Sequence, residues 1–202
     1  MKERSAFDIL IENLVDLGYK PETSVSHKTF VNPTNRFLNQ KYVLCSLPNN
    51  IFFLASDYFG TSVGSSTFTG LYSSINLHCD AEYKVMKKDW LDFIYRKRKK
   101  TGIEYIDKIL TILSLHYIPS KELSKRNVEL FLELSNKDPY HLIVENDYIP
   151  QIQELKGAKT IGIETNGWIY QKDDLINLLE IGQNLITNIK IDTHKSNSIS
   201  NN

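Results

Sequence analysis

The residues best suited to chemistry begin with His78, Cys79 and Asp80, which Glu82 follows closely. Four groups that can bind a metal or take part in catalysis therefore lie within five residues. In an extended strand, His78 and Asp80 would share one face and Cys79 the other. A zinc site needs further ligands, and the chain has neither a C-x2-C nor an H-x3-H spacing. We predict no metal site and favour a structural strand with Cys79 turned inward, while His78 and Asp80 stay weak catalytic candidates.

A second candidate site is the only long run of like charge in the chain. It consists of Arg96, Lys97, Arg98, Lys99 and Lys100. These cations could contact phosphates while Tyr95 stacks on bases, or they could touch an anionic ligand or a protein partner. The alternative is a solvated helix end, where cations complement the helix dipole. The chain as a whole is neutral, with 24 basic and 24 acidic residues. Because nucleic-acid-binding proteins present a broad basic face, we favour the helix end over nucleic-acid binding.

Two further patterns carry weaker signals. Residues 60–70 are rich in glycine, serine and threonine but lack the Lys-Ser/Thr pair of a phosphate-binding loop. We interpret them as a connection between strands. Glu145, Asp147 and Glu164 fall near predicted strand ends, where paired carboxylates could do acid–base work or bind a hard cation. The sequence does not fix their distances, so ordinary turn chemistry is the favoured interpretation.

The elements that must position these residues follow from apolar periodicity. Helical spacing predicts helices at 6–17, 120–135 and 173–190, and a short helix at 89–95 that ends in the basic run. Strand-like patterns lie at 42–47, 51–55, 68–79, 83–86, 109–115, 140–145, 160–165 and 168–171. Residues 20–40 resemble a long connection with one short strand near 29–31. Asn166-Gly167 predicts a type I′ hairpin turn between the last two strands.

This order of elements predicts an α+β fold with a mainly antiparallel sheet, packed by N-terminal, middle and C-terminal helices. We expect a single domain over residues 1–192 and a disordered polar tail over 193–202. A division near Lys100 into two smaller halves is the alternative. At 202 residues, either arrangement fits the usual size of protein domains.

Composition bounds the class of protein. The chain is 41% hydrophobic and 24% charged, as soluble globular proteins are. It has no apolar stretch long enough to span a bilayer and no secretory leader pattern. The two cysteines, Cys45 and Cys79, lie in apolar strand patterns, so buried thiols are favoured over a disulfide. These features predict a cytoplasmic protein.

The leading functional hypothesis is a non-enzymatic binding or interaction domain, because no catalytic pattern is specific and eleven tyrosines suit a recognition surface. The first alternative is a hydrolase-like or transferase-like enzyme with a dispersed site near His78, Asp80 and residues 60–70. The second is a nucleic-acid-binding module that uses residues 96–100. No cofactor is predicted.

Overall fold

The computed structural model describes residues 4–28, 38–60, 64–78, 80–90 and 98–199. The helices are α1 (Ala6–Asp16), α2 (Glu104–Ile109), α3 (Lys125–Leu134), α4 (Lys172–Asn177) and α5 (Gln183–Ile199), with a π-helical turn (Leu178–Gly182) between the last two. The strands are β1 (Glu22–Lys28), β2 (Leu38–Leu47), β3 (Ile51–Gly60), β4 (Gly64–Ser74), β5 (Tyr83–Lys87), β6 (Arg98–Lys99), β7 (Leu110–Ser114), β8 (Tyr140–Asn146) and β9 (Lys159–Asn166).

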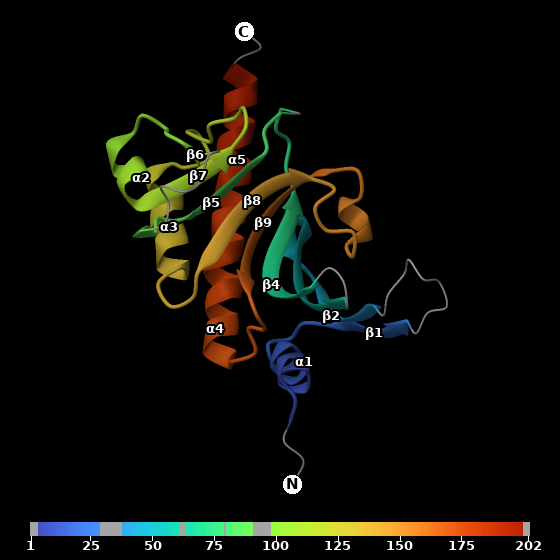
Figure 1. The fold of residues 1–202 in the computed structure, drawn as a ribbon. Coiled ribbons are helices and arrows are strands. Elements are labelled where there is room, and N and C mark those ends of the chain that lie inside the picture. Colours follow the sequence, from blue (N-terminus) through green and yellow to red (C-terminus); the bar gives the residue numbers. More distant parts are fainter. Residues whose placement is uncertain (1–3, 29–37, 61–63, 79, 91–97, 200–202) are drawn as a thin grey trace.

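The nine strands form one continuous sheet in the order β1-β2-β3-β4-β9-β8-β5-β7-β6. Every neighbouring pair is antiparallel. The long helix formed by α4, the π-helical turn and α5 runs along one side of this sheet, with α3 beside it and α1 near its N-terminal end (Figure 1). The predicted α+β fold with an antiparallel sheet packed by N-terminal, middle and C-terminal helices is confirmed.

The helices form where local signals and apolar spacing agree. Ser5 is the N-cap of α1: its hydroxyl accepts a hydrogen bond from the Asp8 backbone N–H at 3.3 Å. Leu10 and Leu14 are fully buried on its inner face. Ser124 begins α3 in the same way, with a 3.4 Å bond from the Asn127 backbone N–H. The helix predicted from residue 120 therefore starts later, at its serine cap.

The main core lies between the helices and one face of the sheet. Alternate strand residues such as Phe53, Leu71 and Ile163 are fully buried there. The hairpin predicted from the runs 42–47 and 51–55 is confirmed as β2 and β3, joined by a short 3-10 turn. Phe52 and Leu54 are also buried, on the opposite face, so β3 is covered on both sides as its continuous apolar run predicted.

Several sequence predictions differ from the structure. Residues 168–171 form no strand. Instead, the Gly167 N–H bonds the Thr67 carbonyl at 2.8 Å, and the Ile169 N–H bonds the Thr69 hydroxyl at 3.1 Å. The predicted final hairpin was therefore wrong. The backbone N–H groups of Gly167 and Ile169 bond to residues of β4 and not to a strand that returns along β9. Gly167 does have a positive φ of 93°, but Asn166 does not, which excludes a type I′ turn.

Other element boundaries also moved. The predicted connection over 20–40 contains the edge strand β1, while the strand expected near 29–31 lies outside the described residues. The final helix, predicted to end near residue 190, continues to Ile199, and Thr193 is buried. The helix therefore includes seven residues, 193–199, that the sequence assigned to the polar tail. Most of the short helix predicted at 89–95 also lies outside the described residues.

The two faces of the sheet are covered differently. We call the side that carries none of the α-helices the helix-free face; the short 3-10 helix Gln153–Leu155 lies on it. It carries the alternate residues Lys84 and Met86 of β5, Leu113 of β7, His141, Ile143 and Glu145 of β8, and Glu164 of β9. Over β3 and β4, this face is covered by the segment 148–155, whose Ile149, Ile152 and Leu155 pack with Tyr72 and Leu54. Over β5, β7 and β8, none of the described helices covers it.

Candidate functional site on the helix-free face

Strand register aligns a row of residues across the helix-free face. The row runs through Arg98, Leu113, Lys84, Ile143, Gly162, Tyr72 and Phe52, each opposite the next on a neighbouring strand. Residues directly opposite in antiparallel strands point to the same face. The row is charged at the β6 edge and becomes apolar and aromatic toward the centre of the sheet. Residues far apart in sequence therefore meet on this face, where Arg98, Leu113 and Lys84 are partly exposed and Tyr72 and Phe52 are buried beneath residues 148–155.

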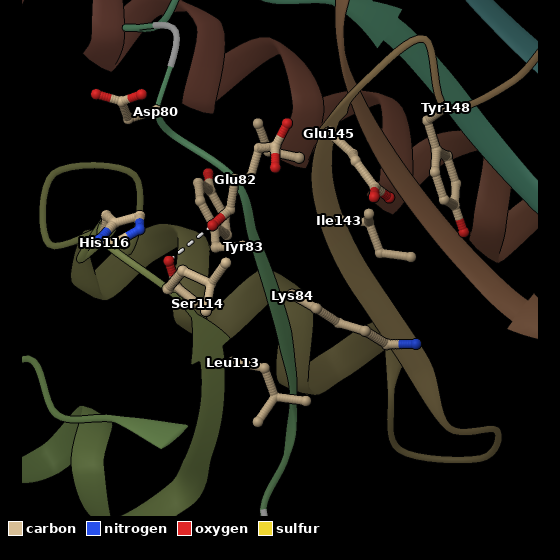
Figure 2. Close-up of a pocket in the computed structure, with 12 residues that line it drawn as sticks. Asp80, Glu82, Tyr83, Lys84, Leu113, Ser114, His116, Ile143, Glu145 and Tyr148 are labelled. Atoms are coloured by element: carbon tan, nitrogen blue, oxygen red, sulfur yellow. Dashed lines mark hydrogen bonds between the residues drawn. The ribbon is translucent and has the colours of Figure 1, made fainter. Parts of the chain in front are cut away.

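A cleft of about 490 Å³ opens over β5, β7 and β8, and we call it the central cleft. Leu113 on β7 and Ile143 on β8 lie at its base, on either side of Lys84 on β5, and Tyr148 lies beyond the end of β8 (Figure 2). Its acidic lining residues are Asp80, Glu82 and Glu145, and His116 lies on the side away from Tyr148. The cleft therefore combines an apolar base with a predominantly acidic wall.

Hydrogen bonds fix the entry to β5 against its neighbours. The Ser114 hydroxyl donates to the Glu82 carbonyl at 2.7 Å (Figure 2). The Asn146 side-chain amide donates to the Glu82 carboxylate at 2.7 Å. Glu82 is therefore tied through its backbone to β7 and through its side chain to β8. These bonds hold its carboxylate at the edge of the central cleft.

The segment after β7 is anchored by Tyr117. Its backbone N–H bonds the Ser114 hydroxyl at 3.1 Å, and its ring stacks on Tyr83 with 5.8 Å between centroids. Its hydroxyl donates to the buried Glu122 carboxylate at 2.6 Å. Burial raises the pKa of the Tyr117 phenol, and the nearby Glu122 carboxylate raises it further. The phenol therefore stays protonated and able to donate. This anchor keeps Leu115, which is 56% exposed, at the rim of the cleft.

Glu145 is a carboxyl group of the central cleft whose pKa is raised by its surroundings. Burial raises its pKa, and the nearby carboxylates Glu82 and Glu164 raise it further, while Lys84 acts in the opposite direction. A carboxyl group shifted by burial and like charges is the kind that proteins use for proton transfer. The sequence identified Glu145 and Glu164 as carboxylates at strand ends, and the structure places both on one face.

Glu164 is held by two tyrosines. The Tyr72 hydroxyl donates to one carboxylate oxygen at 2.9 Å and the Tyr148 hydroxyl donates to the other at 2.8 Å. Burial and the charge of Glu164 raise the pKa of both phenols. Both tyrosines are therefore neutral hydrogen-bond donors at physiological pH, and the carboxylate is oriented without being neutralised.

His141 lies directly opposite Glu164 in the β8–β9 register. Burial is the main cause that lowers the pKa of His141 to about 4, and the positive charge of Lys84 acts in the same direction. The imidazole is therefore neutral at pH 7 and does not offset the charge of Glu164. The neutral state of His141 could not be predicted from the sequence, because the sequence does not show that Lys84 and His141 share a face.

The two catalytic candidates predicted from sequence lie next to each other, but only one of them lines the central cleft. The His78 and Asp80 side chains are 72% and 68% exposed, and His78 Nδ1 lies 3.5 Å from an Asp80 carboxylate oxygen. Asp80 lines the central cleft, whereas His78 does not. Cys79 lies outside the described residues. The turn therefore contributes one carboxylate to the rim, and the catalytic role of His78 and Asp80 stays a prediction.

The basic run is only partly described. Arg98 and Lys99 form the two-residue edge strand β6, and Lys100 is exposed beyond it. Tyr95, Arg96 and Lys97 lie outside the described residues. The helix end favoured by the sequence is thus replaced, at Arg98 and Lys99, by strand pairing with β7. Register places Arg98 opposite Leu113, which lines the central cleft.

Sequence reasoning missed Lys84, Ile143, Tyr148 and Tyr72 as site residues. Alternation along 140–145 could have placed Ile143 and Glu145 on one face, but the β5–β8 pairing that brings Lys84 beside them joins distant segments. No group of three or more His, Cys, Asp or Glu residues in the described ranges could hold a metal ion. No helix in those same ranges is long and apolar enough to cross a membrane.

Comparisons with known proteins add no assignment: no protein-family model, curated protein or solved structure matches the chain.

Proposed function

We propose that the protein is a binding domain and that the central cleft receives a ligand or partner segment combining apolar groups with positive charge. Leu113 and Tyr148 offer partly exposed apolar surface, and Ile143, which is 5% exposed, closes the base. Asp80, Glu82 and Glu145 outnumber the single lysine, Lys84, along the lining. Pockets with an apolar base and a few convergent polar groups are the usual form of ligand sites.

One observation supports this proposal most directly: the unequal cover of the helix-free face. Residues 148–155 pack over β3 and β4 and bury Phe52 and Leu54. Over β5, β7 and β8, no comparable segment among the described residues covers the same face, and the central cleft opens there. A sheet face that is apolar at its base and uncovered is a typical position for a binding surface.

Titration calorimetry with two matched peptides would test the proposal. One acetylated peptide alternates leucine and lysine, and the other alternates leucine and glutamate. We expect the lysine peptide to bind and the glutamate peptide to bind at least about tenfold more weakly, since like charges along the acidic wall repel it. The double variant Glu82→Gln, Glu145→Gln should reduce this preference. Equal binding of both peptides, or binding of neither, would contradict the proposal.

An enzyme using acid–base catalysis is the second candidate, and the raised pKa of Glu145 beside Glu82 favours it. In this candidate Glu145 is the proton-transferring carboxyl; Asp80 lines the same cleft, and His78 does not. Glu145→Gln should then abolish a hydrolase or transferase activity while leaving thermal stability unchanged. An activity found in the parent and retained in this variant would contradict a role for Glu145.

Nucleic-acid binding through residues 96–100 stays a disfavoured alternative, and an anionic ligand or protein partner at that run stays a prediction. A cytoplasmic location is part of the proposal. It is supported by Cys45, whose free, buried thiol suits a reducing compartment.

A further inference from the structure

A second cleft, of about 580 Å³, lies across Tyr148 from the central cleft, and we call it the Glu164 cleft. It is formed by the N-terminal part of β4, the segment after β8, and the end of β9. Its principal lining residues are Thr67, Phe68, Tyr148, Gln151, Glu164 and Asn166. Tyr148 lines both clefts, but the residues that give each its chemistry differ.

The Glu164 carboxylate has acceptor capacity left over. A carboxylate offers about four acceptor positions, and Tyr72 and Tyr148 supply one donor each. Among the residues that the structure describes, no lysine, arginine or histidine nitrogen lies within 4.0 Å of it to form an ion pair. A half-buried carboxylate usually has a cationic partner, because burial without one is costly.

The neighbouring groups leave this charge in place. Glu164 is close enough to Glu145 to raise the pKa of that carboxyl. His141, on the adjacent strand, is neutral at pH 7 because burial and Lys84 lower its pKa to about 4. Tyr72 and Tyr148 are neutral donors. The cleft therefore presents a negative charge that the surrounding described side chains do not balance.

The rest of the lining also suits a cation. Phe68 and Tyr148 bring aromatic rings to the cleft beside Glu164, and ring faces attract ammonium and guanidinium groups. Gln151 lines the same cleft, and its side-chain oxygen is buried with no hydrogen-bond partner among the described residues. That oxygen is a second acceptor for a ligand that brings N–H donors.

We propose that the Glu164 cleft binds a small organic cation, a guanidinium or primary ammonium group, between the Glu164 carboxylate and the rings of Phe68 and Tyr148. A guanidinium fits best, because it carries several N–H donors and the cleft offers two acceptors, the Glu164 carboxylate and the Gln151 side-chain oxygen. This site goes beyond the proposed function, since its ligand chemistry depends on Glu164 and not on the central cleft.

The carboxylate is fixed in advance by packing on the sheet. A Cβ added at Gly162 would stand 2.7 Å from Tyr72 Cδ1, and one at Gly70 would stand 2.7 Å from the Tyr72 hydroxyl oxygen. Two glycines thus let the tyrosine ring lie against β9 and β4. The Tyr72 hydroxyl is thereby already in place to hold Glu164. Binding of a cation then does not have to order the Glu164 side chain, which favours affinity.

Titration calorimetry with butylguanidinium, butylammonium, butanol and butyrate tests the site. We expect butylguanidinium to bind most tightly, then butylammonium, with butanol and butyrate at least about tenfold weaker. An arginine-containing peptide forms a further arm. Binding of both the peptide and the free cation assigns the cleft to arginine side chains, and binding of the free cation alone assigns it to small molecules. Equal binding of butylguanidinium and butanol would overturn the proposal.

Two variants and a control locate the binding. Glu164→Gln should weaken butylguanidinium binding at least about tenfold, because it removes the charge and keeps an acceptor for the tyrosines. Phe68→Leu keeps the charge and removes a ring, so it should weaken binding more modestly even if Glu164→Gln fails to fold. Glu180→Gln, at an exposed helical position, is the matched control. Unchanged binding in Phe68→Leu and Glu164→Gln, or an equal loss in Glu180→Gln, would overturn the assignment.

Discussion

The ring of Tyr72 lies directly against Gly162, so close that a Cβ at position 162 would stand 2.7 Å from Tyr72 Cδ1. The two residues are opposite each other in the β4–β9 register. This contact orients the phenol toward Glu164, 2.9 Å away. A glycine in a central strand is otherwise unfavourable, so its presence here follows from the close approach of the ring.

Gly162→Ala should therefore destabilise the protein by about 1–3 kcal/mol, because the ring has no room to accept the methyl group. Denaturant unfolding would measure this change. The matched control is the same substitution in a Tyr72→Ala background, where the methyl group has space. We expect a smaller cost there, and an equal cost in both backgrounds would show that Tyr72 is not the residue responsible.

Cys45 should react slowly with thiol reagents in the native protein. It is 1% exposed, and burial raises the pKa of its thiol to about 12, so very little thiolate is present at pH 8. The measurement is the labelling rate in a Cys79→Ser variant, with and without denaturant. Rapid native labelling would contradict the packing of β2. Burial of Cys79, which lies outside the described residues, stays a prediction.

Gly167 has a φ of 93°, a conformation that disfavours side chains even though no atom lies within 4 Å of a Cβ placed there. Gly167→Val should cost about 1–3 kcal/mol through backbone strain alone. Gly167→Asn should cost less, because asparagine tolerates positive φ more readily. Thermal unfolding of the two variants would separate strain from steric conflict. Equal stability of the valine variant and the parent would show that position 167 adopts another conformation.

His141 should make stability depend on pH between about 4 and 6.5. Its folded-state pKa is lowered to about 4 from an ordinary value of 6.5, so the unfolded chain binds more protons in this window. Stability from neutral His141 is therefore complete above pH 6.5 and is lost as the pH falls toward 4. Measured against His141→Gln, the parent should lose more stability over this range. Parallel curves for the two proteins would contradict the buried, neutral histidine.

The fold class could be predicted from sequence because it depends on local patterns. Apolar spacing located α1 and α3, and Pro48 to Asn50 marked the turn between β2 and β3. Gly167 was correctly assigned a positive φ, yet the hairpin inferred from it was wrong. Its backbone partner, Thr67, comes from a strand about one hundred residues earlier, and no local signal indicates such a partner.

The candidate site was harder to predict for the same reason. The sequence emphasised contiguous groups, namely His78 to Asp80 and the basic run 96–100. The structure instead assembles Lys84, Ile143 and Glu164 from three strands, joined by pairings between distant segments. Glu145 and Glu164 were recognised as carboxylates at strand ends, but the tyrosines that hold Glu164 and the neutral state of His141 depend on packing.

The most direct test of the account is to map binding on the folded protein by backbone amide NMR during titration with the alternating leucine–lysine peptide. Saturable shifts centred on Lys84, Ile143 and Glu145, absent with the leucine–glutamate peptide, are the result we predict. Shifts that centre on the helix side of the sheet, on α3 and α5, would contradict the assignment of binding to the helix-free face. So would the absence of any saturable shift.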